Sequence, residues 1–168
     1  LGKLLAHFEI ALRNGIHREL SLNASPNGLA SVAWWDTHWA NLSTSMQNAI
    51  QAERTSAGRV LGPDEIVSRL SFGVWPNVLR WTAKSRARLL GPIFPGHPLT
   101  LSGGPGWADR RLRNDALDEV FEIKDVRNRV AHHEPLWKFT NVMDTSRGLP
   151  VVKVAGSTND VTSLARFA

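Results

Sequence analysis

The sequence predicts a single all-α domain, and three observations point to this fold class. Apolar residues recur every three or four positions in several long segments, which is the period of a helix with one buried face. Strand-like composition is confined to one short segment, residues 151–154. At 168 residues with 42% hydrophobic content, the chain is long enough for one substantial core and short for two. We therefore expect one helical domain over residues 1–139, followed by a tail over residues 140–168 in which the helical pattern weakens.

The N-terminal third contains two predicted helices. Residues 4–22 form the first, with a buried stripe that consists of Leu5, Phe8, Leu12, Ile16 and Leu20. The turn-forming segment NASPNG, residues 23–28, ends it. A second apolar stripe predicts a helix over residues 36–54, with Asp36 as a candidate cap.

The middle of the chain predicts shorter elements. Residues 61–70 indicate a turn and then a helix, because Pro63 suits a first helical turn and the two acidic residues after it suit the positive helix end. Residues 71–90 continue as helix, broken near Gly73 and Pro76. Residues 91–106 are rich in proline and glycine, which predicts an irregular connector and not a helix.

A long helix over residues 108–133 follows this connector. Ala116, Val120, Ile123 and Val130 fall within about 80° of one another on a helical projection and mark its core face. Arg127 projects near the middle of that face. Because a charge aimed at a core is costly unless it is paired or lines a cavity, Arg127 needs a partner.

The end of this helix, RNRVAHHEP, gathers the polar residues of the candidate site. Arg127 and His132 lie about 140° and 7.5 Å apart on an ideal helix, so they would not share a face. Pro135 disfavours helical geometry at the residue before it, and a loosened last turn could bring His132 or His133 toward the arginine. Alternatively, a phosphate bridges the two groups, or a second chain supplies one of them.

The first helix offers a second polar set. Glu9, Arg13 and His17 are spaced by four and stack along one side of the helix, where Glu9 could hold an arginine. We predict that this helix packs against the long helix and that one polar cleft forms. Its members would be Glu9, Arg13, Asn14, Arg127, Asn128, His132 and His133. The alternative for Glu9 and Arg13 is an ordinary intrahelical ion pair, and His17 has the character of a surface or structural residue.

Composition and charge limit the partners and cofactors. The net charge of +5 comes mainly from 15 arginines against 5 lysines, which favours recognition of phosphate or carboxylate and makes RNA or DNA a candidate partner. Arg80, Lys84, Arg86 and Arg88 form a basic run that either follows an RNA backbone or is a solvated helix face. The absence of cysteine excludes disulfides and thiolate ligands and fits a reducing cytoplasm, and we expect no membrane segment, metal or other cofactor.

Three ordered blocks carry a resemblance to a known family. Arg127, Asn128 and His132 follow the R-N-x-x-x-H signature of the HEPN superfamily of all-helical nucleases. The blocks HFEIALRNGIHREL, LSFGVW and DVRNRVAHHEPLW resemble, in that order, the Abi-like abortive-infection family. The similarity covers roughly residues 4–139 and departs from the family pattern in the connector and after Phe139.

The resemblance implies a HEPN-like helical bundle and metal-independent RNA cleavage in a homodimer whose motif helices share a composite site. His132 would act on the ribose 2′-hydroxyl or the leaving oxygen, Arg127 would hold the phosphate, and Asn128 would orient one of them. His133 is either a second acid or base or a packing residue, and Arg129 would contact RNA. The biological role would be phage defence or that of a toxin, with an inhibitory partner unknown. The alternative is a catalytically silent helical module that binds RNA or a protein partner.

Overall fold

The computed structural model describes residues 1–102 and 106–133, together with the backbone of residues 139–144 and 149–154. The longer helices are α1 (Gly2–Ala24), α3 (Thr44–Ser56), α4 (Pro63–Arg69), α5 (Val74–Ser85) and α8 (Arg110–Ala131). Shorter ones are α2 (Trp34–His38), α6 (Leu90–Ile93) and α7 (Pro98–Leu101), with 3₁₀ turns at Trp39–Asn41, Ala87–Leu89 and Gly106–Ala108. An antiparallel pair, β1 (Phe139–Asp144) and β2 (Leu149–Val154), follows α8. The prediction of an all-α fold is confirmed for the helical domain, to which this small hairpin is appended.

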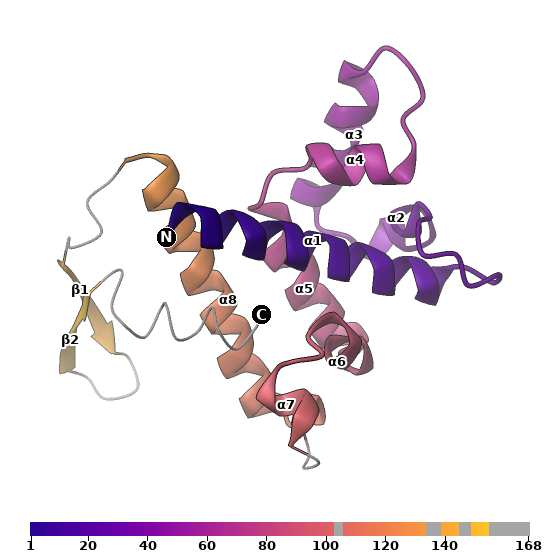
Figure 1. The fold of residues 1–168 in the computed structure, drawn as a ribbon. Helices are drawn as coiled ribbons and strands as arrows, with labels where there is room; N and C mark the ends of the chain where they lie inside the picture. Colours follow the sequence, from indigo (N-terminus) through magenta and orange to yellow (C-terminus); the bar gives the residue numbers. More distant parts are fainter. Residues whose placement is uncertain (103–105, 134–138, 145–148, 155–168) are drawn as a thin grey trace.

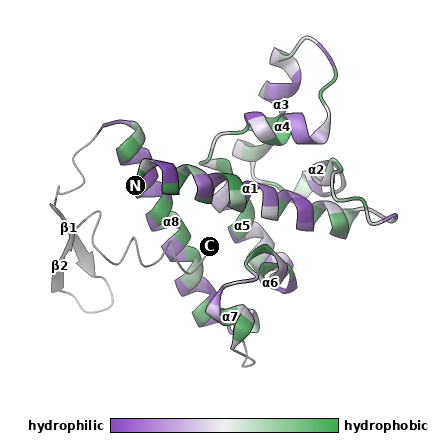
Figure 2. Cartoon of the chain, viewed as in Figure 1, coloured by the Kyte–Doolittle hydropathy of each residue, from purple (hydrophilic) through white to green (hydrophobic). Residues whose placement is uncertain are grey.

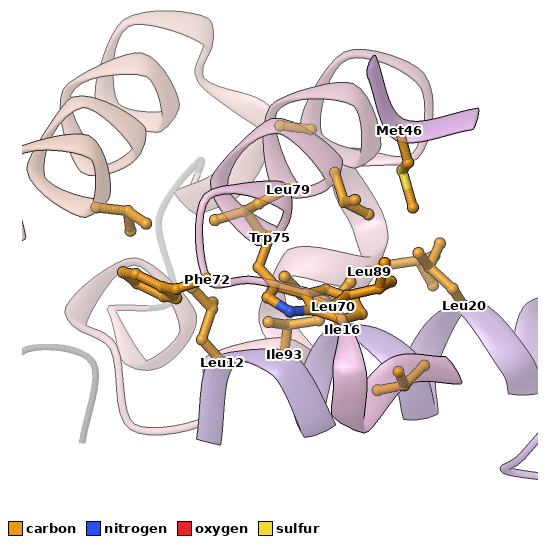
Figure 3. Close-up of a cluster of buried hydrophobic side chains, with 14 of the residues drawn as sticks. Leu12, Ile16, Leu20, Met46, Leu70, Phe72, Trp75, Leu79, Leu89 and Ile93 are labelled. Atoms are coloured by element: carbon orange, nitrogen blue, oxygen red, sulfur yellow. The ribbon is translucent and has the colours of Figure 1, made fainter. Parts of the chain in front are cut away.

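Helices α1, α5 and α8 contact one another pairwise and enclose the core. Figure 1 shows α1 crossing both of the other helices, with its N-terminal half over the C-terminal half of α8. The predicted stripe of α1 is buried, from Leu5 to Leu20. Figure 3 shows Leu12 and Ile16 pointing from α1 toward Phe72 and Trp75, which precede and open α5. The buried residues form one hydrophobic cluster between Leu5 and Val126.

The predicted helix over residues 36–54 is wrong as a single element. The chain forms α2, a 3₁₀ turn and then α3, with extended backbone at Leu42 and Ser43 between the last two. The Ser43 hydroxyl accepts a hydrogen bond from the backbone N–H of Met46 and so caps α3. A serine that satisfies the first free N–H groups of a new helix competes with continuation of the old one.

The predicted connector over residues 91–106 contains more helix than expected. It includes most of α6 and all of α7, and Pro98 occupies the first helical position of α7, where a missing N–H costs nothing. The break expected near Gly73 and Pro76 lies before Val74, with Gly73 at the N-cap of α5. Pro76 does not break the helix, because it lies in the first turn of α5. Trp107 is buried and donates to the Thr100 hydroxyl, which favours packing over base stacking for this residue.

Helix α8 confirms the predicted motif helix, and its amphipathic character is visible in Figure 2 as alternating hydrophilic and hydrophobic residues. Ala116, Val120 and Ile123 are buried, as the helical projection predicted. Asp109 caps the helix by accepting hydrogen bonds from two backbone N–H groups, those of residues 111 and 112. The single short strand expected at residues 151–154 forms as the end of β2, whereas β1 was not predicted.

Asp109 should matter for the stability of the helix that carries the motif. We expect Asp109→Ala to lower the free energy of unfolding by about 1 kcal/mol, because two helical N–H groups lose their acceptor. Urea denaturation followed by tryptophan fluorescence measures this change. Asp115→Ala removes an exposed carboxylate from the same helix without touching the cap and serves as the control. Equal losses in the two variants would contradict the capping role.

Candidate functional site

Arg127 is the centre of the candidate site and has two partners from distant parts of the chain. Its Nε donates a hydrogen bond of 3.0 Å to Oε2 of Glu9 on α1. Its guanidinium carbon lies 5.7 Å from the centre of the Phe72 ring, in the loop before α5. The side chains of Arg127 and Glu9 are 34% and 21% exposed, so the ion pair is partly shielded from water and partly reachable. Arg127 was expected to need a partner, and that partner is Glu9.

The contact with Phe72 joins all three sequence blocks at one point. Glu9 belongs to the first block, Phe72 to the second and Arg127 to the third. Phe72 is itself buried and meets the ring of Phe8 edge to face, with 6.3 Å between the ring centres. An apolar residue such as Phe72 gives no sign of a site role by its type, and only its place in the second block could have indicated one. Attraction between a guanidinium and an aromatic face adds to the ion pair.

The geometry of the Glu9 bond leaves one edge of the guanidinium available. Glu9 accepts from Nε, and among the described residues no hydrogen bond joins Nη1 or Nη2 of Arg127 to a partner. These two nitrogens carry the parallel N–H groups that pair with two oxygens of a phosphate or carboxylate. Among the described residues, Arg127 is thus held on one side and presents its other donors to a possible anion.

His132 and His133 lie at the exposed C-terminal end of α8. The backbone N–H of His132 donates to the carbonyl of Asn128 at 2.9 Å, which is the bond of a regular helical turn. His133 has a φ of 55°, and its N–H donates to the carbonyl of Val130. The helix therefore ends in a left-handed residue that closes the last turn, a position where glycine is more usual. The turn remains regular as far as His132, in contrast to the loosening expected from Pro135, which itself lies outside the described residues.

A regular last turn keeps Arg127 and His132 on different sides of α8, about 140° apart around the helix axis. Asn128 and Arg129, which lie between them in sequence, are half-buried. Asn128 is four residues before His132 and so belongs to the same side of the helix as the histidine. Within one chain the motif therefore presents two groups, a paired arginine toward α1 and an exposed histidine with an amide beside it.

Arg13 and Asn14 take a different position from Glu9. The Nε of Arg13 donates to Oδ1 of Asn14 at 3.2 Å, so Arg13 forms neither the expected ion pair with Glu9 nor a bond to α8 among the described contacts. Both residues line a cavity of about 690 Å³ whose lining also includes His17 and Asp64 of α4 but not Glu9 or Arg127. The predicted single cleft is thus divided into the Arg127 cluster and this second cavity.

His17 is buried and joins three helices, which agrees with a structural role. The indole N–H of Trp34 on α2 donates to its Nδ1 at 3.1 Å, and its Nε2 lies 3.1 Å from Oδ1 of Asp64 on α4. Because the indole can only donate, Nδ1 is unprotonated, and the proton of the neutral ring is on Nε2, facing Asp64. Burial lowers the pKa of His17, and the Asp64 carboxylate opposes that shift in part.

The four residues of the predicted basic run, which begins in α5 and extends past its end, have different surroundings. The guanidinium carbon of Arg80 lies 3.9 Å from the centre of the Phe121 ring on α8, and its Nη2 is 3.6 Å from Asp118. Arg86 points to the other end of the domain, over the Trp81 ring and toward Nδ1 of His38. Lys84 and Arg88 are exposed. The four residues therefore do not form one continuous track, and Arg80 alone among them contacts the motif helix in the described part of the chain.

Comparison of the chain with protein-family models, with curated proteins and with solved structures gave no match. Among the described residues, no helix has both the length and the apolar character needed to span a bilayer. The same part of the chain contains no group of three or more His, Asp or Glu side chains arranged to hold a metal ion. The site is therefore interpreted from its own geometry and from the resemblance of the three blocks.

Acidification should destabilise the fold through His17, which is buried, and His38, which is half-buried. The pKa values of His17 and His38 are lowered, chiefly by burial, so the unfolded chain binds more protons than the folded chain just below pH 6.5. The two neutral histidines contribute fully to the free energy of unfolding above pH 6.5. This contribution is lost as the pH falls from 6.5 through their pKa values in the folded state. Urea denaturation should give a lower free energy of unfolding at pH 5.5 than at pH 7.5, with most of the loss below pH 6.5.

The variant His17→Gln tests the assignment of this effect. Its free energy of unfolding should depend less on pH across the same range, because of the two histidines with a lowered pKa only His38 remains. His7→Gln changes an exposed histidine on the same helix and should leave the pH dependence as in the wild type. An unchanged pH dependence in His17→Gln would remove His17 as its source.

Proposed function

We propose that the protein is a metal-independent endoribonuclease that acts at the Arg127, Asn128 and His132 motif. The observation that supports this most is the meeting of the three sequence blocks at Arg127, whose Nε is held by Glu9 while its other nitrogens have no described partner. An arginine that presents two parallel donors beside a partly exposed surface suits the binding of a phosphodiester.

Arg127 would bind the scissile phosphate through Nη1 and Nη2. As the phosphorus becomes five-coordinate, negative charge accumulates on its equatorial oxygens, and a fixed guanidinium stabilises that charge without reorganising. Glu9 is a positioning residue in this scheme. Its carboxylate fixes the rotation of the guanidinium through Nε, and Phe72 lies at one side of the group.

His132 would carry the proton transfers. An imidazole can accept the proton of the ribose 2′-hydroxyl, whose oxygen then attacks the adjacent phosphorus. The bond from phosphorus to the 5′-oxygen of the next nucleotide breaks, and that oxygen takes up a proton. The products are a 2′,3′-cyclic phosphate and a 5′-hydroxyl, and no protein nucleophile or metal enters the reaction. DNA lacks the attacking hydroxyl and would not be cleaved.

The neighbouring polar residues would have supporting roles. Asn128, on the His132 side of α8, would orient the imidazole or the phosphate through its amide. His133 is exposed beside His132 and could supply the second proton transfer. Arg129 would contribute a phosphate contact away from the reacting centre.

The separation of Arg127 and His132 around α8 favours a site shared by two chains. A homodimer in which the C-terminal ends of the two α8 helices meet would bring the histidine of one chain toward the arginine of the other. This arrangement is also what the resemblance to the Abi-like family implies. The resemblance further suggests a role in phage defence or as a toxin, and the absence of cysteine fits a cytoplasmic setting.

Cleavage of RNA without metal is the first test. Purified protein incubated with end-labelled single-stranded RNA in EDTA should produce fragments that end in 2′,3′-cyclic phosphate, and the matching DNA should remain intact. His132→Ala should lower the rate of cleavage at least about 100-fold, the usual contribution of a general acid or base, with the circular dichroism spectrum unchanged. His7→Ala, an exposed histidine outside the motif, is the control. RNA that stays intact with the wild-type protein would count against the nuclease proposal.

A shared site makes a second, sharper prediction. Arg127→Ala and His132→Ala should each be inactive alone, whereas a mixture of the two, unfolded together and refolded, should regain part of the wild-type rate. In a mixed dimer one of the two composite sites would keep both intact groups. Light scattering at micromolar concentration should give the mass of a dimer. No recovery in a mixture that contains verified mixed dimers would show that each chain uses its own arginine and histidine.

A catalytically silent module that binds RNA or a protein is the second candidate function. The observation that favours it is the same 140° separation, because in a single chain the motif residues cannot act on one phosphate. This candidate predicts a monomer that binds RNA and leaves it intact, and that is unaffected by His132→Ala.

A further inference from the structure

The cavity that contains Arg13 and Asn14 has the form of a trough over the outward face of α1. Its floor includes Ala11, Asn14 and Gly15, and its volume is about 690 Å³, within the usual range for small-molecule sites. One wall comes from α4 and the other from α6 and the residues after it. Figure 1 shows these two helices on opposite sides of α1. The trough is therefore formed by three elements and does not involve the motif helix.

Hydrogen bonds join both walls of the trough, α4 and α6, to its floor on α1. On the α4 side, the buried His17 is bonded to Asp64 and receives the indole N–H of Trp34. On the α6 side, Nη2 of Arg18 donates to the carbonyl of Pro92 at 3.2 Å. Gly15 lies against α6, where a Cβ would be 3.4 Å from the carbonyl oxygen of residue 93, about van der Waals contact. The trough is thus preformed, which lowers the cost of ordering it around a ligand.

The floor presents hydrogen-bond donors without a described acceptor. Arg13 uses only Nε, toward Asn14 Oδ1, so its Nη1 and Nη2 and the amide nitrogen of Asn14 have no partner among the described residues. Arg18 uses Nε for Glu19 and Nη2 for the Pro92 carbonyl, which leaves Nη1. Two guanidinium groups and an amide within one and a half helical turns suit an anion with several oxygens.

The α4 wall presents acceptors in place of donors. Asp64 binds His17 through Oδ1, and its other oxygen has no described partner. The Ser68 hydroxyl donates to the carbonyl of Glu65, so its lone pairs can still accept. A bare anion would be repelled by the Asp64 carboxylate, whereas a ligand with hydroxyl groups at this end would donate to it. The opposite wall, which includes Pro92 and Pro95, offers apolar surface to a carbon skeleton.

We propose that the α1 trough binds a small phosphate monoester that carries hydroxyl groups, the chemistry of a sugar phosphate. The phosphate lies over Arg13 and Asn14, with Nη1 of Arg18 near it, and the hydroxyl groups face Asp64 and Ser68. This site uses none of the residues that have a role in the proposed RNA cleavage. Arg13 and Asn14, which the sequence predicted in one cleft with Arg127, belong to the trough instead. The inference stands whether or not the protein cleaves RNA.

Isothermal titration calorimetry with three probes tests the ligand class. Ribose 5-phosphate should bind with one-to-one stoichiometry, inorganic phosphate should bind more weakly, and ribose should give no measurable heat. Arg13→Gln should weaken binding of ribose 5-phosphate about tenfold or more, because it removes a charged donor. Arg111→Gln, which changes an exposed arginine on α8, should bind as the wild type does.

Asp64→Asn tests the orientation of the ligand. The amide oxygen can still accept from His17, so the α1 to α4 contact is kept and circular dichroism should be unchanged. This variant should bind inorganic phosphate as tightly as the wild type or more tightly, and should lose most of the preference for ribose 5-phosphate. Three results would overturn the proposal. The wild type could bind ribose 5-phosphate and inorganic phosphate with equal affinity, or bind neither. Alternatively, Arg13→Gln could bind ribose 5-phosphate as tightly as the wild type.

Discussion

The ion pair between Arg127 and Glu9 fixes how the three principal helices meet. A guanidinium on the core-facing side of α8 would be costly if it stayed uncompensated, and only a carboxylate at this point of α1 is bonded to it. The ring of Phe72 lies at 5.7 Å from the same guanidinium, so the loop before α5 is drawn to the same place. Phe72 then contacts Phe8, one residue before Glu9, and closes the cluster. One charged side chain thus brings residues of α1, α8 and this loop together at one point, next to the hydrophobic core that packs the same helices.

The sequence was sufficient for the parts of the fold that depend on long periodic patterns. The buried stripes of α1 and α8 follow from residue spacing alone, and the need of Arg127 for a carboxylate follows from its place on the core face. The points where one helix ends and another begins were harder to predict. Ser43 divides the expected second helix by capping α3, and Pro98 begins a helix inside a segment that its composition marked as irregular. The role of Phe72 depends on tertiary contact and has no periodic signal, so only its block of sequence could have indicated it.

The positive charge of the chain is largely compensated by local partners. Arg54 is bonded to Asp36, Arg59 to Glu65, and Arg80 lies near Asp118. The bond from Arg59, with a second from the Gly62 N–H, lowers the pKa of the Glu65 carboxyl to about 2. Exposed pairs of this kind contribute little to stability. They also leave these arginines less available for phosphate, because each already has a carboxylate nearby. The more specific support for RNA binding comes from Arg127, whose Nη1 and Nη2 have no partner among the described residues.

The division of the predicted cleft follows from the geometry of α1. Residues spaced by four on a helix advance by about 400°, so each lies about 40° further round the axis than the one before. Glu9, Arg13 and His17 therefore fan over about 80° while they rise about 12 Å, and the row turns from the side that faces α8 to the side that faces α4. Glu9 meets Arg127, His17 meets Asp64, and Arg13, midway between them, reaches neither and lines the trough. Glu9, Arg13 and His17 are spaced in the sequence as if they shared one face of α1. They nevertheless belong to two sites, because α8 and α4 pack against different sides of this helix.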